Sequence, residues 1–161
     1  MFDVKVVTSL REVDCAPTCL KMLLDYYGVD VDLDTLIAES NLNINGMSAK
    51  ETVRVGKLHG LDLKAYEMSV DELAHSDRPA IIWWRNNHFC IFCGVDKDGR
   101  MQIINPDRGK YRLNKDTFDV FYSGVALFNG EPHEMIEPSA EERLEAQVLY
   151  TAMMTDTLLE V

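Results

Sequence analysis

The chain has 161 residues, 47% of them apolar, and its 16 basic and 27 acidic side chains give a formal net charge of -11. This length and apolar content fit one globular domain with its own core, and the negative charge disfavours nucleic acid and anionic lipid as partners. A neutral or cationic peptide is easier to accommodate. No apolar run is long enough to cross a bilayer and no signal peptide is recognisable, so we expect a cytoplasmic protein without membrane insertion.

The first half of the chain has mainly helical patterns. An extended segment, 3–8, precedes a helix that begins at Cys15, where Asp14 can cap it, and that stops before Gly28. The Cys15 helix should be buried along one face, because its leucines recur at helical spacing. The patterns then predict two more helices, a short strand and a brief helix with a capping box, at residues 34–40, 49–58, 61–68 and 69–75.

From residue 78 onward the pattern is typical of strands rich in β-branched and aromatic residues. Five strands are predicted, at residues 80–85, 88–95, 101–105, 110–113 and 124–128. Asn86-Asn87 is expected to form a two-residue turn, and residues 96–99 a hairpin loop. Helices followed by antiparallel strands predict an α+β domain in which the sheet packs on the opening helices.

The sequence changes character again after residue 128. Residues 129–138 hold glycine and prolines among acidic residues and are predicted to be a linker. Residues 139–161 begin with a capping box and are apolar for a free tail, which indicates a C-terminal helix that needs a partner. We therefore expect one folded domain, 1–128, and a helical tail that docks on this domain, on a second copy or on another protein.

Cys15 is the candidate nucleophile, because amides and the helix dipole stabilise a thiolate at the first turn of a helix. Without a secretion signal the four cysteines should be reduced thiols rather than disulfides. Cys19, one turn further on, is interpreted as a core residue. A zinc site is rejected, because Cys90 and Cys93 lie in one predicted strand with their sulfurs on opposite faces. We expect no metal and no cofactor.

A cysteine nucleophile needs a base and a group that orients the base. His88 is the candidate base, because it opens a strand directly after a turn, where its ring can project towards another element. Asn105 closes the next strand, where it can accept the other ring N–H. The remaining histidines lie in polar surroundings typical of solvated side chains: His59, His75 and His133.

These residues and their order resemble the bacteriocin-processing cysteine peptidases, papain-like domains that cut leader peptides after a double glycine, usually in front of a membrane exporter with an ATPase. The resemblance covers roughly positions 3 to 128 and is carried by segments 14–19, 26–28, 46–48, 58–61 and 105–109 together with His88. It implies Cys15 as nucleophile, His88 as base and Asn105 as orienter. The family usually has aspartate where this chain has Asn105, and papain-like enzymes use asparagine in that role.

The oxyanion site departs from the family. Ser9 stands where the family has a glutamine whose amide helps to hold the oxyanion, and loss of one such donor typically costs on the order of a hundred- to a thousand-fold in rate. The backbone N–H of Cys15 remains as one donor, and Ser9 is a weak candidate for the other. Turn asparagines could supply the amide instead: Asn45, Asn86 and Asn87.

Substrate contacts are indicated more weakly. Trp83 and Trp84 alternate in one predicted strand; both can pack, and the one near His88 could line a peptide groove with Asn87. The expected function is a stand-alone cytosolic cysteine peptidase for a peptide or protein with small residues at the cut, and its Gly-Gly specificity is implied by the resemblance alone. Three alternatives stay open: a degenerate peptidase fold that binds a peptide without cutting it, a glutamine-directed deamidase or transglutaminase with the same Cys-His pair, and a phage structural or adaptor protein that acts through its tail.

Overall fold

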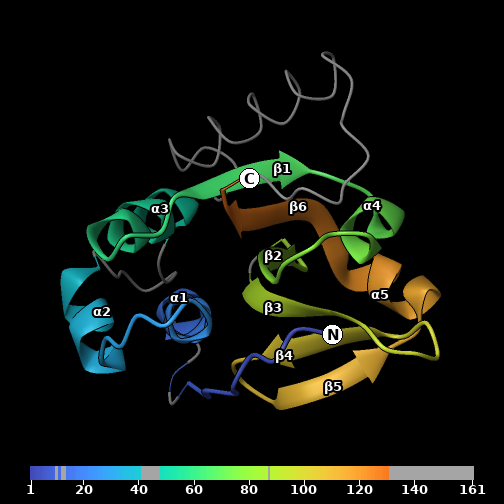
Figure 1. Cartoon of the computed structure of the whole chain (residues 1–161), viewed down its shortest axis with the longest axis horizontal. Coiled ribbons are helices and arrows are strands. Elements are labelled where there is room, and N and C mark those ends of the chain that lie inside the picture. Colours follow the sequence, from blue (N-terminus) through green and yellow to red (C-terminus); the bar gives the residue numbers. More distant parts are fainter. Residues whose placement is uncertain (10, 12–13, 41–47, 87, 131–161) are drawn as a thin grey trace.

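A computed structural model of the chain describes residues 1–9, 11, 14–40, 48–86 and 88–130. In these residues six strands form one antiparallel sheet in the order β1-β6-β2-β3-β4-β5, with helices on both faces (Figure 1). The predicted loop at 41–46 lies outside the described residues, as do most of the linker and the whole tail. Asn45, Asn87 and His133 lie outside them as well.

Helices α1 (Cys15–Tyr26), α2 (Leu33–Glu39) and α3 (Ala49–Leu58) lie on one side of the sheet (Figure 1). α1 ends as predicted, because Gly28 adopts a left-handed conformation at φ 79° that a helix cannot continue through. The Ser48 side chain caps α3 by accepting the Glu51 N–H at 3.1 Å. The three helices therefore form at the predicted places, within one or two residues.

The strands follow with α4 and α5 between them. Their bounds are β1 (Leu63–Glu67), α4 (Val70–Ala74), β2 (Ala80–Trp84), β3 (His88–Val95), β4 (Met101–Asn105), β5 (Gly109–Leu113), α5 (Lys115–Phe121) and β6 (Tyr122–Asn129). α4 has the predicted capping box between Ser69 and Glu72. α5 was not predicted; Asn114 caps it by accepting the Thr117 N–H at 2.8 Å, and its one buried side chain is Phe118.

Side chains alternate between two cores, one on each face of the sheet. On β3, Ile91 and Cys93 pack on the side of α1, whereas Cys90 and Phe92 pack on the side of α4 and α5. Both faces are covered by helices, which explains why β2 is buried at every position. The predicted α+β arrangement, with the opening helices packed on an antiparallel sheet, is confirmed.

The turn between β2 and β3 differs from the prediction. Trp84 pairs with His88, so the connection has three residues, 85–87, rather than the two predicted at Asn86-Asn87. Arg85 and Asn86 take positive φ values of 55° and 60°. The α5–β6 segment stabilises this shape, because the Arg85 N–H donates to the Phe121 carbonyl and the Asn86 N–H donates to the Ser123 hydroxyl, each at 2.9 Å.

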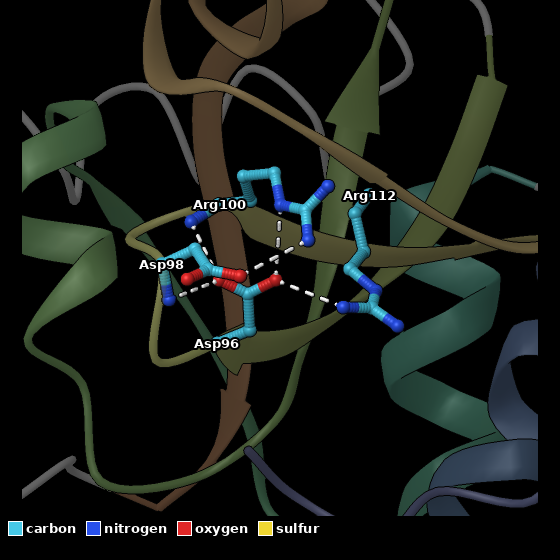
Figure 2. A network of polar contacts seen from close by, with 4 residues as sticks. All are labelled: Asp96, Asp98, Arg100 and Arg112. Carbon is cyan, nitrogen blue, oxygen red and sulfur yellow. Dashed lines mark hydrogen bonds and ion pairs between the residues drawn. The ribbon is translucent and has the colours of Figure 1, made fainter.

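The buried Asp96 lies at the closed end of the β3–β4 hairpin, in a network with Asp98, Arg100 and Arg112 (Figure 2). His88 and Asn105 lie at the open end of the same hairpin. Its Oδ1 accepts the backbone N–H groups of Asp98 and Arg100 at 2.9 Å. Its Oδ2 lies 3.2 Å from both Arg100 Nε and Arg112 Nη1. The backbone bond from Arg100 and the bond from Arg112 lower the pKa of Asp96 below its ordinary value. The hairpin is thus fixed at the end opposite the candidate site.

None of the helices in the described part of the chain has the length and the apolar character that a membrane-spanning helix needs.

Candidate active site

Cys15 is the first residue of α1 and is 8% exposed. Asp14 occupies the N-cap position, but the expected cap through its side chain is absent. The carboxylate instead binds Arg11 Nε and Nη2, each at 2.9 Å, because a guanidinium offers two charge-assisted bonds where a backbone amide offers one. Since Arg11 neutralises this carboxylate, the dipole of α1 can still favour a thiolate at Cys15.

α1 packs against β3, the strand that His88 opens. Burial raises the pKa of the Cys90 thiol well above its ordinary value, and Cys15 and Asp107 raise it further. Burial likewise raises the pKa of the Cys19 thiol, with contributions from Cys90, Cys15 and Asp107. Cys15 thus acts electrostatically on Cys90, which lies two residues after His88 on β3. All four cysteines are thiols, as predicted.

His88 and Asn105 form the predicted contact. His88 Nε2 lies 3.0 Å from Asn105 Oδ1, and the residues are largely buried, with a 12% exposed imidazole and Asn105 at 7%. Asn105 Oδ1 also accepts the Asp107 N–H at 3.0 Å, which fixes the amide with its oxygen towards His88. An oxygen can only accept, so Nε2 must carry a proton. In the neutral ring the lone pair is then on Nδ1.

Tyr111, on β5, is near Asn105 on the other side. Burial raises the pKa of this phenol, and a hydrogen bond from Asn105 opposes part of the rise. Asn105 Oδ1 is therefore held by the Asp107 backbone amide and by His88, and the half-buried phenol of Tyr111 lies near this side chain. A side chain fixed in this way can hold an imidazole in one orientation.

Ser9 lies beside the turn that follows Asn105. Its N–H donates to the Pro106 carbonyl at 2.9 Å, and its hydroxyl is 3.4 Å from that carbonyl and 3.2 Å from Asp107 Oδ1. Both groups near the hydroxyl are acceptors, so its single proton is directed towards them. Ser9 is thus brought to the site, where it contacts Asp107. Asp107 was not among the predicted residues, and its only signal in the sequence is its place two residues after Asn105.

Trp83 and Trp84 are each 3% exposed and lie on opposite faces of the sheet. The Trp83 ring meets Phe89 edge-on, with centroids 5.0 Å apart, and Trp84 packs on Phe118 at 5.3 Å. This burial supports the packing role that was one of the two interpretations. Their part in substrate binding stays a prediction, as does that of Asn87.

In the described residues, no group of three or more His, Cys, Asp or Glu side chains is arranged to hold a metal ion. Cys90 and Cys93 indeed lie in opposite cores, the geometry on which the zinc site was rejected. The chemistry that the site offers is therefore a thiol at a helix start and an imidazole with one nitrogen committed to an amide oxygen.

The sequence is similar to that of secretion and processing proteins from bacteria. The probable microcin-H47 secretion/processing ATP-binding protein MchF of Escherichia coli is 24% identical over 150 residues, which are 93% of this chain and 21% of that protein. The colicin V secretion/processing ATP-binding protein CvaB of Escherichia coli is 27% identical over 124 residues, 77% of this chain and 18% of that protein. The chain thus spans about a fifth of the length of these relatives.

Solved structures share the fold. A double glycine motif protease from an AMS/PCAT transporter, in complex with the leader peptide, superposes with a TM-score of 0.75 at 25% identity and covers 79% of this chain and 91% of its own. The peptidase domain of Streptococcus ComA gives 0.72 at 22% identity, with 78% and 96% covered. The predicted papain-like fold is confirmed. The Peptidase C39 family model matches residues 3–133, so the chain belongs to this family of cysteine peptidases.

Proposed function

We propose that this chain is an active cysteine peptidase that removes a leader segment from a peptide substrate by cutting after a double glycine, with Cys15, His88 and Asn105 as its triad. The observation that carries the proposal is the 3.0 Å bond between His88 Nε2 and Asn105 Oδ1, which commits one ring nitrogen and leaves the other for the thiol. Membership of the C39 family and the similarity to a protease solved with a leader peptide support the substrate class.

In the first step, the Cys15 thiol proton passes to His88 Nδ1 and the sulfur attacks the carbonyl carbon of the scissile bond. The imidazole then carries two protons, and Asn105 accepts the Nε2–H throughout. The negative charge moves to the carbonyl oxygen. The backbone N–H of Cys15, at the start of α1, supports this oxyanion together with the positive end of the helix dipole.

In the second step, His88 Nδ1 returns the proton to the leaving amine as the carbon–nitrogen bond breaks. The leader stays bound to Cys15 as a thioester and the mature peptide departs. Water then gives a proton to the same nitrogen and attacks the thioester, which releases the leader as a carboxylic acid and restores the thiol. All four cysteines being thiols suits a reaction in the reducing cytosol.

The test uses the purified 161-residue chain and a synthetic peptide whose leader ends in Gly-Gly, with mass spectrometry of the products. Cys15→Ala and His88→Ala should abolish cleavage, whereas Cys19→Ala, on the same helix, and His75→Ala, at an exposed position, should retain it. Because the chain is assayed alone, the result also shows whether it acts without a transporter. Cleavage by Cys15→Ala at the wild-type rate would overturn the proposal.

A second candidate is a module that binds the peptide without cutting it. The observation that favours it is the Ser9 hydroxyl, which faces two acceptors rather than a position for an oxyanion donor. The same assay separates the two functions when the binding of an uncleavable peptide is measured by calorimetry. Micromolar binding with no product after prolonged incubation would establish the binding module.

A further inference from the structure

The Asp107 carboxylate faces the imidazole of His88. Its Oδ2 lies 3.8 Å from His88 Nε2, and the side chain is 38% exposed. This is an ion pair only when the imidazole carries two protons. Asn105, the direct hydrogen-bond partner of His88, is neutral, so it orients the ring but adds no charge to balance an imidazolium.

Three contacts hold Asp107 in this place. Its backbone N–H donates to Asn105 Oδ1 at 3.0 Å, and its Oδ1 lies 3.2 Å from the Ser9 hydroxyl. The Ser9 N–H donates to the carbonyl of Pro106, the residue before Asp107, at 2.9 Å. One carboxylate oxygen is thus engaged by Ser9 and the other is directed to His88.

Other charged and titratable groups also lie near this site, on the elements packed around it. Burial raises the pKa of Cys90 and of Tyr111; Arg85, in the turn after β2, opposes part of both rises, and Arg108 opposes part of the rise at Tyr111. Two guanidinium groups therefore act on residues that neighbour His88 and Asn105. The other titratable groups described near the site are two buried thiols and a phenol whose pKa values burial raises, so they are neutral at pH 7: Cys19, Cys90 and Tyr111.

We infer that Asp107 is a positioning residue that stabilises the protonated imidazole of His88, and that Ser9 serves to hold this carboxylate. The inference deepens the proposed function, on which its effect on catalysis rests. In the resting site the carboxylate favours the imidazolium that pairs with a Cys15 thiolate. In the first step it stabilises the same imidazolium while Asn105 keeps the ring in place. The negative charge and the orientation thus come from two neighbouring side chains.

The test compares Asp107→Asn with wild type, with Asp119→Asn as a control at an exposed position. Removing one charge at 3.8 Å should move the alkaline limb of the kcat/KM profile to lower pH by about 0.5–1 unit, which lowers kcat/KM about threefold to tenfold above that limb. Asp107→Glu, which keeps the negative charge, should bring the alkaline limb part of the way back to its wild-type pH. Ser9→Ala should shift the limb in the same direction by less, and Asp119→Asn should leave it unchanged.

A second readout does not depend on cleavage. The ring signals of His88, followed by NMR over the same pH range, should change at lower pH in Asp107→Asn than in wild type. If the chain cuts no peptide but the NMR shift is present, the proposed function fails and the inference on Asp107 stands. If Asp107→Asn loses activity with both profiles unshifted, the residue has only a structural role and the inference is overturned.

Discussion

Gly94 gives a prediction that links the N-terminal segment to the sheet. It lies in β3 at φ 101°, where the register with β4 shifts, and a Cβ there would stand 3.0 Å from the Met1 Cα and 3.5 Å from the Phe2 ring. The Phe2 N–H donates to the Cys93 carbonyl at 2.7 Å, so the chain start is fixed at this point. Gly94→Ala should therefore carry both a backbone penalty and a steric one.

Gly99→Ala separates the two penalties, because Gly99 has a similar φ of 81° and a Cβ at this position would meet no described residue beyond its chain neighbours within 4 Å. A left-handed alanine costs about 1–2 kcal/mol, and the reduced entropy of the unfolded chain offsets about 0.4–1 kcal/mol of that. Close contact with backbone adds about 1–3 kcal/mol at Gly94 alone. We expect Gly94→Ala to lower the free energy of unfolding by about 1–4.5 kcal/mol, and Gly99→Ala by about 0–1.5 kcal/mol, with the loss at Gly94 larger by the steric contribution of about 1–3 kcal/mol.

Urea unfolding followed by tryptophan fluorescence measures both variants, and the thermal midpoint should fall by about 2–4 °C for each kcal/mol. Equal losses in the two variants would refute the reasoning, because they would show that the approach of residues 1 and 2 to β3 adds nothing to the strain of the turn itself.

Three further predictions concern stability and accessibility. Folding lowers the pKa of Asp96, so its contribution to stability is full above the ordinary carboxylate pKa and is lost as the pH falls through the lowered pKa. Asp96→Asn should therefore be less stable than wild type at neutral pH, and the difference in the free energy of unfolding, measured by urea titration, should disappear in acid. Burial raises the pKa of Cys93 to about 12, so its contribution to stability is full below the ordinary thiol value and is lost as the pH rises towards about 12. Iodoacetamide at about pH 9, with the labelled site identified by mass spectrometry, should modify Cys93 only after unfolding, and modification of Cys93 in the native chain would contradict its burial. Trp84→Ala should cost about 3–5 kcal/mol in urea unfolding, because the indole packs between Phe118 and Phe121, and a loss below about 1 kcal/mol would place the ring outside the core.

Local patterns were sufficient for most elements of the fold. The α1 helix and strand β3 were predicted with their starting residues, since α1 follows an aspartate at the N-cap position and has leucines at helical spacing, whereas β3 follows a turn and is a continuous apolar run. α5 was missed because residues 115–121 bury a single side chain, so no helical face stands out. The turn at 85–87 was predicted one residue short, because the contacts that stabilise it come from Phe121 and Ser123, far along the chain.

In the candidate site, too, one contact could be predicted from the sequence and another could not. The contact between His88 and Asn105 could be predicted, because it spans one hairpin and both residues stand at strand ends. The contact between Ser9 and Asp107 joins residues 98 apart through a segment that is not part of any strand, so no period or spacing indicates it. Sequence reasoning treated Ser9 only as a missing oxyanion donor. The contact of its hydroxyl with Asp107 could not be predicted from the sequence.

This difference bears on the proposed peptidase activity of a chain that has a serine at position 9. If Ser9 holds Asp107 rather than an oxyanion, then Ser9→Gln should not simply raise the proposed cleavage rate. The substitution removes the hydroxyl that lies 3.2 Å from Asp107 Oδ1, and an amide directed to an oxyanion is not available to this carboxylate. We expect Ser9→Gln to move the alkaline limb of the kcat/KM profile to lower pH, as Ser9→Ala does, whatever its effect at the optimum. A Ser9→Gln variant with higher kcat/KM and an unshifted limb would show that position 9 acts on the oxyanion alone and that Asp107 needs no support from it.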